Sequence, residues 1–322
     1  MRRAAIIADM RAIGVTQYGG PEMLHELDLP AEPLGPGQLR VRVTAATVNP
    51  TDTGLRSGSR ATSDRPDGGV AVPGMDIAGT LAEIGPDVTT DLSVGDHVMA
   101  IVLPSGAHGG YREDLVLPAR SVVRVPAGVS DVEASTLPMN GLTARQALDL
   151  LALQPGHVVA VTGAAGAVGG FAIQIARAEG LTVIADASEA DEELVRGLGA
   201  DVVVRRGTDV ADRFRDHFPD GVDGLVDAAL LGEPVLPALR DGGAMATVRG
   251  YAGDGSRSLR VMPVSVRAYG EEQDKLDGLR GLVERGAITL RVAETYPADR
   301  AADAHRRLEA GGTRGRLVLR FD

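Results

Sequence analysis

The stretch Val158-Val-Ala-Val-Thr162 runs directly into Gly163-Ala-Ala-Gly-Ala-Val-Gly169 and then into Phe171-Ala-Ile-Gln-Ile-Ala176. The first segment is apolar and β-branched, the second is a glycine-rich turn, and the third is amphipathic, so the order predicts strand, turn and helix. Free N–H groups and the helix dipole favour an anion at a helix N-terminus. We therefore predict that a dinucleotide places its diphosphate over this turn. The alternative is a Gly- and Ala-rich turn in some other α/β protein.

Each glycine of the turn has its own expected task. Gly163 permits a tight turn, Gly166 lets the backbone approach a diphosphate, and Gly169 lets the helix pack closely on the sheet. The predicted cofactor-binding residues of the turn are Gly163, Ala164, Ala165, Gly166, Ala167, Val168 and Gly169.

Composition restricts the class of protein and its partners. The 322 residues are 44% hydrophobic and 24% charged, which is ordinary globular composition and enough for roughly two domains. The net charge of -11 argues against a nucleic-acid or anionic-membrane partner, because both require a basic surface. No apolar run approaches a membrane span, and the apolar start before Asp9 is too short for a signal peptide. We expect a cytoplasmic protein with a small-molecule substrate.

The chain contains no cysteine. Disulfides, thiolate zinc sites, iron–sulfur clusters and a cysteine nucleophile are therefore impossible. Lys275 is the only lysine, on a charged helix-like stretch, which disfavours Schiff-base chemistry. The six histidines form no His-x-x-x-His pair, so we expect no metal site.

The hydrophobic pattern changes along the chain. Up to about residue 125, short β segments at 39–44, 77–84, 97–102 and 114–117 are separated by Gly, Pro and Asp turns, which is typical of an antiparallel unit. From about 135 to 250, strands alternate with helices, which favours a doubly wound parallel sheet and an α/β fold class. The tail predicts a strand at 259–266, helices at 271–285 and 298–310, and a closing strand at 315–320 that packs on the first domain. A cleft between two such domains is the expected ligand site.

Further motifs accompany the glycine turn in a fixed order. They are Val48-Asn-Pro-Thr-Asp52, Val72-Pro-Gly-Met-Asp-Ile-Ala-Gly79, Gly95-Asp-His-Val98, Asn140-Gly-Leu-Thr-Ala144 and Gly315-Arg-Leu-Val-Leu319. With them the chain resembles the medium-chain dehydrogenase/reductase superfamily, and within it the zinc-independent quinone oxidoreductase branch. The resemblance implies a GroES-like β-rich catalytic domain at 1–134, completed by 265–322, and a Rossmann domain at 135–264. It also implies a homodimer and an NAD(P)H-dependent reductase acting on a quinone or α,β-unsaturated carbonyl compound.

The same resemblance bears on zinc. Zinc-dependent relatives place a cysteine where Asn49 stands, a His-Glu pair where Met75 and Asp76 stand, and a third ligand near 138–140. Since this chain offers an amide and a thioether there and no thiolate, we expect no zinc. Hydride transfer to an already activated electrophile then asks mainly for orientation and for hydrogen-bond donors near the substrate oxygen.

The resemblance also suggests which side chains meet nicotinamide and substrate. It places Asn49 and Thr143 beside the nicotinamide ring and Val248 and Arg249 along its carboxamide. Asn49 is the candidate catalytic donor, although Asn49-Pro50 with Asp52 as a helix cap is an equally good purely structural interpretation. The candidate substrate contacts are Asn49, Arg56, Met75, Tyr111, Asn140 and Tyr251. For the tyrosines the alternative is a core or surface filler, and for Arg56 a solvated loop charge.

The choice between NADPH and NADH rests on residues after the second and third predicted strands. Asp186 stands where a carboxylate accepts hydrogen bonds from an adenosine ribose and repels a 2′-phosphate, which favours NADH. Ser188, Arg205 and Arg206 stand where the branch approaches that phosphate, and a guanidinium binds phosphate well. We favour NADPH and keep NADH open because of Asp186. A solvated strand end is the alternative for the two arginines.

Two other functions remain open. The short-chain dehydrogenases share the glycine turn but need Tyr-x-x-x-Lys, which this chain lacks. A nucleotide-binding structural or regulatory protein without turnover is compatible with every motif. An enoyl-thioester reductase of the same superfamily is a further alternative, although 53–56 lacks the tyrosine that such enzymes often carry.

Overall fold

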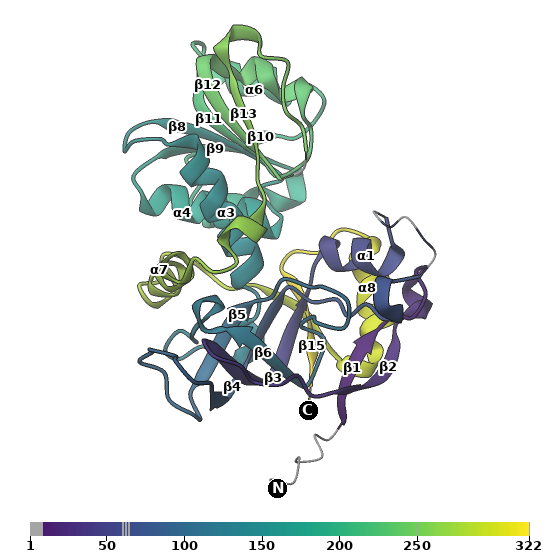
Figure 1. Cartoon of the computed structure of the whole chain (residues 1–322). Helices are drawn as coiled ribbons and strands as arrows, with labels where there is room; N and C mark the ends of the chain where they lie inside the picture. The colour runs from purple at the N-terminus through teal and green to yellow at the C-terminus, as the bar shows by residue number, and fades with distance from the viewer. Residues whose placement is uncertain (1–8, 60, 62, 64, 249, 322) are drawn as a thin grey trace, which may run out of the picture. The chain divides into compact units, whose positions relative to one another are not determined.

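The computed structural model describes residues 9–59, 61, 63, 65–248 and 250–321. The chain forms two compact units, drawn in Figure 1. Unit 1 comprises Met1–Met139, Gly270–Arg280 and Leu290–Asp322, and unit 2 comprises Asn140–Tyr269 and Gly281–Thr289. Unit 1 is therefore assembled from both ends of the chain, as the predicted packing of the tail requires.

Unit 1 is built mainly on antiparallel strands, with one parallel pair in its larger sheet. A two-stranded sheet pairs β1 (Asp9–Gly14) with β2 (His25–Pro30). The larger sheet has the order β14-β15-β3-β4-β5-β7, with β6 also paired to β3. Its strands are β3 (Gln38–Val48), β4 (Asp76–Ile84), β5 (His97–Ile101), β6 (Asp114–Pro118), β7 (Val122–Arg124), β14 (Val292–Pro297) and β15 (Arg316–Arg320). The register pairs Leu317 of β15 with Val48 of β3, so the C-terminal strand lies against the segment that leads to Asn49.

Short helices connect these strands. α1 (Pro50–Ser57) begins at a capping box in which the Asp52 carboxylate accepts the Asn49 N–H, and α2 (Asp131–Ala134) begins at a second capping box formed by Ser130 and Glu133. α8 (Ala301–Glu309) packs against β15 and β3. The remaining elements of unit 1 are the 3-10 turns η1 (Pro21–Met23), η2 (Asp67–Gly69), η3 (Ala119–Ser121) and η8 (Ala298–Arg300). The helices α3 (Pro138–Leu151) and α7 (Gln273–Glu284) each have residues in both units.

Unit 2 is a six-stranded parallel sheet with the order β10-β9-β8-β11-β12-β13. The strands are β8 (Val158–Thr162), β9 (Thr182–Ala187), β10 (Val202–Arg205), β11 (Val222–Asp227), β12 (Leu239–Thr247) and β13 (Arg260–Pro263). The helices between them are α4 (Ala167–Ala178), α5 (Glu192–Gly197) and α6 (Val210–His217), and the 3-10 turns are η4 (Glu189–Asp191), η5 (Glu233–Ala238), η6 (Ser256–Ser258) and η7 (Val266–Tyr269). From β8 the chain adds β9 and β10 on one side of the sheet, and it then adds β11, β12 and β13 on the other side. The boundary between β8 and β11 is therefore the topological switch point, where such sheets bind ligands.

Each unit has its own hydrophobic core. In unit 1, apolar residues of β3, β4 and β15 pack with α8, and in unit 2, residues of β8, β9 and β11 pack with α6 and η5. Fully burying one such leucine or isoleucine side chain contributes about 1.5–3 kcal/mol. The two cores keep the sheets rigid enough to hold the polar groups at their strand ends.

The predicted fold class is confirmed: an antiparallel β-rich unit accompanies a parallel, doubly wound one. Two predicted elements differ in detail. The strand predicted at 259–266 is β13 alone, since the chain continues into η7, and the helix predicted at 298–310 is divided into η8 and α8. None of the described helices is both long and apolar enough to cross a bilayer.

Candidate functional site

The glycine turn lies at the carboxyl end of β8, between the ends of β9 and β11. Gly163 has φ +66°, which favours glycine. A Cβ on Gly169 would lie 2.8 Å from the Gly163 carbonyl carbon and 2.9 Å from the Ala164 Cα, so helix α4 packs directly on its own turn. Gly166 is the N-cap of α4, and no side chain caps it. The first turn of α4 therefore presents backbone N–H groups that fit a diphosphate.

Asp186 supports this turn from the neighbouring strand. Its Oδ1 accepts a hydrogen bond from the Ala164 N–H at 3.2 Å, and the residue is buried. Burial raises the pKa of Asp186, although hydrogen bonds from the turn and the charge of Arg206 oppose the rise. The sequence suggested a carboxylate directed at a ribose, whereas the structure directs one of its oxygens at the turn.

The residues expected near a 2′-phosphate have different surroundings. Ser188 Oγ donates to Asp191 Oδ2 at 2.5 Å, and Arg205 forms an exposed ion pair with Glu189 at 3.4 Å. Arg206 is exposed, and no ion pair or side-chain hydrogen bond joins it to another described residue. Its guanidinium nevertheless lies close enough to Asp186 to affect the pKa of that carboxyl group. Arg206 is thus the better placed of the two arginines for an added phosphate.

Unit 2 also contains residues that were predicted to lie near the nicotinamide or the substrate, and the structure describes all of them except Arg249. Thr143 and Asn140 are buried on α3, and the Val248 N–H donates to the Asp227 carbonyl at 3.4 Å. Tyr251 is half-buried, with its ring beside Gly232. Arg249 lies outside the described residues.

In unit 1, Asn49 is the centre of a buried polar network. Its Nδ2 donates to Asp76 Oδ2 at 2.6 Å and approaches the Thr47 carbonyl at 3.5 Å, and its Oδ1 accepts from Arg316 Nη2 at 2.7 Å. Arg316 also donates to the Val48 carbonyl, and Asp76 accepts from the Met139 N–H. The side chain of Asn49 is fully buried. Direct donation to a substrate would require Asn49 to give up one of these partners.

Burial changes the proton affinity of the acids in this network. It raises the pKa of Asp76 to about 7 and that of Asp52 to about 6, while backbone hydrogen bonds and the Arg316 charge oppose the rise. Burial lowers the pKa of Arg316, and the two carboxyl groups oppose that change. Burial therefore favours the neutral form of both carboxyl groups, which limits the net buried charge.

Tyr111 extends the network toward α8. Its hydroxyl lies 3.1 Å from His305 Nε2 and 3.4 Å from Asp52 Oδ2, and the two rings meet edge to face. Burial, together with the charge of Arg56, lowers the pKa of His305 to about 3, so this imidazole is neutral. Burial also raises the pKa of Tyr111 well above its usual range. Tyr111 was predicted as a pocket wall, but in the structure it is a fully buried partner of Asp52 and His305.

Arg56 and Met75 are also buried. Arg56 Nη2 forms an ion pair with Glu309 Oε1 at 2.6 Å, and only 4% of its side chain is exposed. The interpretation of Arg56 as a solvated loop charge is therefore wrong. Met75 is buried, and its carbonyl accepts the Val102 N–H.

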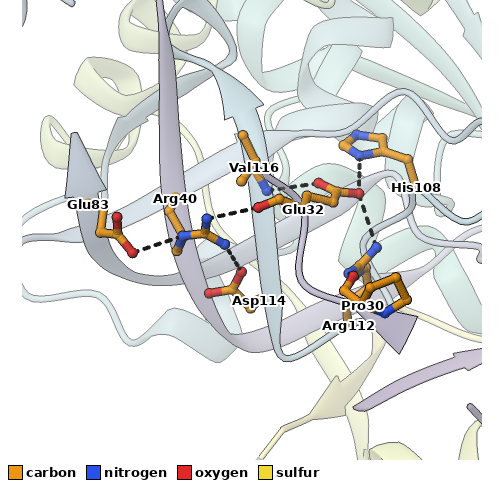
Figure 2. Close-up of polar contacts among 8 residues, drawn as sticks. All are labelled: Pro30, Glu32, Arg40, Glu83, His108, Arg112, Asp114 and Val116. Atoms are coloured by element: carbon orange, nitrogen blue, oxygen red, sulfur yellow. Dashed lines mark hydrogen bonds and ion pairs between the residues drawn. The ribbon is translucent and has the colours of Figure 1, made fainter. Parts of the chain in front are cut away.

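A second polar cluster in unit 1, which the sequence did not indicate, fixes the segment that carries Tyr111. The Glu32 carboxylate accepts hydrogen bonds from His108 Nδ1 at 2.9 Å, Arg112 Nη1 at 3.0 Å and the Val116 N–H at 3.1 Å, as Figure 2 shows. Burial alone would raise the pKa of Glu32, but these partners lower it. Arg112 is buried and follows Tyr111 directly, so Glu32 holds that part of the chain in place.

The zinc-ligand positions can now be compared with the chemistry of zinc. Zinc sites use thiolate, imidazole and carboxylate ligands. The amide of Asn49 donates to Asp76 and accepts from Arg316, and Met75 offers a thioether. The Asp76 carboxylate accepts hydrogen bonds from Asn49 and from the Met139 N–H. Within the described ranges, no group of three or more His, Asp or Glu side chains converges as a metal site would need. The donor set at these positions does not fit a catalytic zinc.

Unit 2 has a hollow of about 400 Å³ whose lining does not include the glycine turn. It is lined by Arg145, Leu148, Asp149, Ala152, Leu153, Pro155, Glu179 and Leu181. Leu153 and Pro155 precede β8 and Leu181 precedes β9, so the hollow is at the amino edge of the parallel sheet. Ligands of such sheets bind at the carboxyl edge, where the glycine turn lies.

Comparison with known proteins agrees with this geometry. Residues 35–127 match the alcohol dehydrogenase GroES-like domain, and residues 198–319 match the zinc-binding dehydrogenase family. A quinone oxidoreductase from Pseudomonas aeruginosa is 32% identical over 96% of this chain and 99% of its own length. The chain belongs to the quinone oxidoreductase-like branch of the medium-chain dehydrogenase/reductase superfamily. Members of this branch are NAD(P)H-dependent oxidoreductases, and this chain is one of them.

Two further similarities concern the cofactor. An NADPH-dependent alkenal/one oxidoreductase from Arabidopsis thaliana is 28% identical over 98% of this chain and 81% of its own length. A mycobacterial protein solved in complex with NADPH superposes with a TM-score of 0.82, at 30% identity over 97% of this chain and all of that one. A nicotinamide cofactor therefore fits both the family and the glycine turn.

Proposed function

We propose that this oxidoreductase transfers hydride from NADPH, without a metal, to a quinone or an α,β-unsaturated carbonyl compound. The observation that carries the proposal is the glycine N-cap of α4, which has no side chain to bond the first turn, beside a turn in which a Cβ on Gly163 or Gly169 would meet backbone atoms. Bound NADPH would supply the hydride, and the backbone N–H groups of the first turn of α4 would hold its diphosphate. Gly163, Gly166 and Gly169 would shape that contact.

The preference for NADPH is supported by Arg206 and by the direction of Asp186. Arg206 is exposed near the end of β10, and a guanidinium binds a phosphate through paired hydrogen bonds. One carboxylate oxygen of Asp186 accepts the Ala164 N–H, so that oxygen is directed at the turn and not at a ribose. The plant relative and the mycobacterial structure both concern NADPH. NADH is the alternative if Asp186 turns toward the ribose.

Metal-free chemistry is supported by the amide and thioether at Asn49 and Met75 and by the absence of cysteine. An alcohol substrate needs a metal-bound alkoxide, whereas a conjugated carbonyl already spreads the incoming charge onto its oxygen. That oxygen then needs a hydrogen-bond donor. Asn49 would provide one by leaving its 3.5 Å contact with the Thr47 carbonyl, or an ordered water would do so, and solvent would supply the proton.

The test of turnover is a set of oxidation assays at 340 nm. Purified protein is mixed with NADPH or NADH and with quinones, enones and an enoyl thioester. We expect oxidation of NADPH with at least one quinone or enone, and no loss of activity after dialysis against a chelator. Tight NADPH binding without oxidation of any acceptor would favour the alternative of a binding protein without turnover. Activity restricted to the thioester would favour the enoyl reductase alternative.

The test of cofactor preference compares two neighbouring arginines. Arg206→Ala should weaken NADPH binding about ten- to a hundredfold, because one charged hydrogen-bonding partner of a phosphate contributes roughly 1.5–3 kcal/mol. It should leave NADH binding unchanged. Arg205→Ala is the matched control, since Arg205 is already paired with Glu189. Asp186→Ser should move the preference further toward NADPH. If both arginine variants keep the parent's affinity for NADPH, Arg206 does not contact its 2′-phosphate.

The proposed homodimer rests on the family resemblance. Light scattering on purified protein should give about twice the 33.3 kDa of one chain. A mass of one chain at micromolar concentration would contradict the dimer.

A further inference from the structure

The loop that follows β11 begins directly beside the glycine turn. β11 pairs in parallel with β8, and the register places Asp227 opposite Thr162. A Cβ on Gly163 would lie 2.9 Å from the Ala228 carbonyl carbon and 3.0 Å from the Ala229 nitrogen. The backbones of the loop and the turn are therefore in contact, and a ligand over the turn reaches the loop as well.

Buried hydrogen bonds hold this loop in one conformation. Asp227 Oδ1 accepts from Thr162 Oγ1 at 2.7 Å and from the Leu231 N–H at 3.1 Å, and Asp227 Oδ2 accepts from the Gly232 N–H at 2.9 Å. The Ala229 N–H donates to Thr162 Oγ1 at 3.3 Å. The positions of Leu230 and Leu231 are thus fixed by groups beneath them.

The loop keeps two unfavourable features. Leu230 has φ +62°, a left-handed conformation that strains a branched residue. Leu230 and Leu231 are 45% and 37% exposed, and among the described residues the only other exposed large hydrophobic side chains are Ile84 and Val94 of unit 1. Strain and apolar exposure together at one point typically mark a functional contact.

The strand order indicates which half of a dinucleotide meets these leucines. A dinucleotide lies across the switch point, with one half over each set of three strands. Asp186 and Arg206 are on the β9 and β10 side, which we assigned to the adenosine half. Leu230 and Leu231 are on the other side of the turn, next to β11, where the nicotinamide half lies.

We propose that Leu230 and Leu231 form an apolar contact for the nicotinamide riboside half of the bound cofactor. This inference rests on the proposed function, because it assumes that the diphosphate lies over the glycine turn. The leucines would pack against the carbon-rich faces of the ribose and the nicotinamide ring, while the glycine turn binds the diphosphate.

The test measures binding of a whole dinucleotide and of its adenosine half by calorimetry. NADPH is compared with adenosine 2′,5′-bisphosphate, and NADH with AMP, on the parent and on Leu230→Ser, Leu231→Ser and the double variant. Each single change should weaken dinucleotide binding about tenfold, since partial burial of one leucine is lost, and should leave the adenosine fragments unaffected. Val94→Ser is the matched control and should change neither.

Leu230→Gly separates loss of contact from loss of fold. Glycine accepts the left-handed backbone, so the variant should keep the parent's melting temperature while binding NADPH about tenfold more weakly. The inference is overturned if the double variant binds the dinucleotide like the parent. It is also overturned if fragment and dinucleotide weaken equally, because the loop would then only support the turn. If the parent binds neither dinucleotide, the proposed function itself fails, which the parent titration alone reveals.

Discussion

Replacing Gly169 by alanine should disrupt the glycine turn while leaving the rest of the fold in place. The added Cβ would lie 2.8 Å from the Gly163 carbonyl carbon and 2.9 Å from the Ala164 Cα. Both are backbone atoms, so no side chain can rotate away and the turn must shift. Overpacking of this kind costs about 1–3 kcal/mol, against which alanine in a helix recovers about 0.5–1 kcal/mol. We expect a net loss of about 1–2 kcal/mol in the free energy of unfolding.

Cofactor affinity should fall as well. A shift of the turn moves the N–H groups at the start of α4, and one lost hydrogen bond to a charged group weakens binding about ten- to a hundredfold. Urea unfolding and NADPH fluorescence titration measure the two effects. Gly278→Ala is the control, because it makes the same change inside α7 with no atom within 4 Å. It should stabilise the fold by about 0.5–1 kcal/mol without changing affinity. Parent-like stability and affinity in Gly169→Ala would refute the argument that close packing sets the turn.

Two further predictions concern the buried network of unit 1. Burial raises the pKa of Asp76 from 3.8 to about 7, so the stability that this carboxyl group contributes is complete below the lower pKa and is lost as pH rises through the higher one. Relative to the parent, Asp76→Asn should therefore gain about 3 kcal/mol between pH 4.5 and 7.5 in urea unfolding. A constant difference would show that Asp76 titrates normally. Tyr111→Phe removes the hydroxyl that lies 3.1 Å from the buried His305 Nε2 and 3.4 Å from Asp52 Oδ2, and it should lower the free energy of unfolding by about 1–3 kcal/mol. Tyr296→Phe removes a hydroxyl that donates to the exposed Glu294 and should change it by less than about 0.5 kcal/mol. Equal effects would contradict the buried role.

The sequence could predict the elements whose signal is local. An apolar strand, three spaced glycines and an amphipathic segment predict β8, the turn and α4, because backbone sterics and helix periodicity act within a few residues. The tail was likewise expected to complete the first unit, and β15 does pair with β3. The absence of thiolate chemistry followed from composition alone.

The direction of individual side chains could not be predicted in this way. Asn49 is held by Arg316, which lies 267 residues away in the sequence, and Arg56 is paired with Glu309, 253 residues away. His305 belongs to none of the motifs quoted from the sequence, yet it is fully buried against Tyr111. The sequence signals for this buried network were the polar residues of the motifs at 49–52 and 315–317. No local pattern pairs such distant residues.

By itself, therefore, the sequence determined the α/β class, the position of the glycine turn and the ligand chemistry that the chain lacks. The tertiary structure alone decided that Asp186 supports the turn and that Asn49 belongs to a shared buried network with Asp76 and Arg316. The physical reason is that periodicity and glycine spacing record short-range sterics, whereas burial and hydrogen-bond partners depend on which distant segments the sheets bring together.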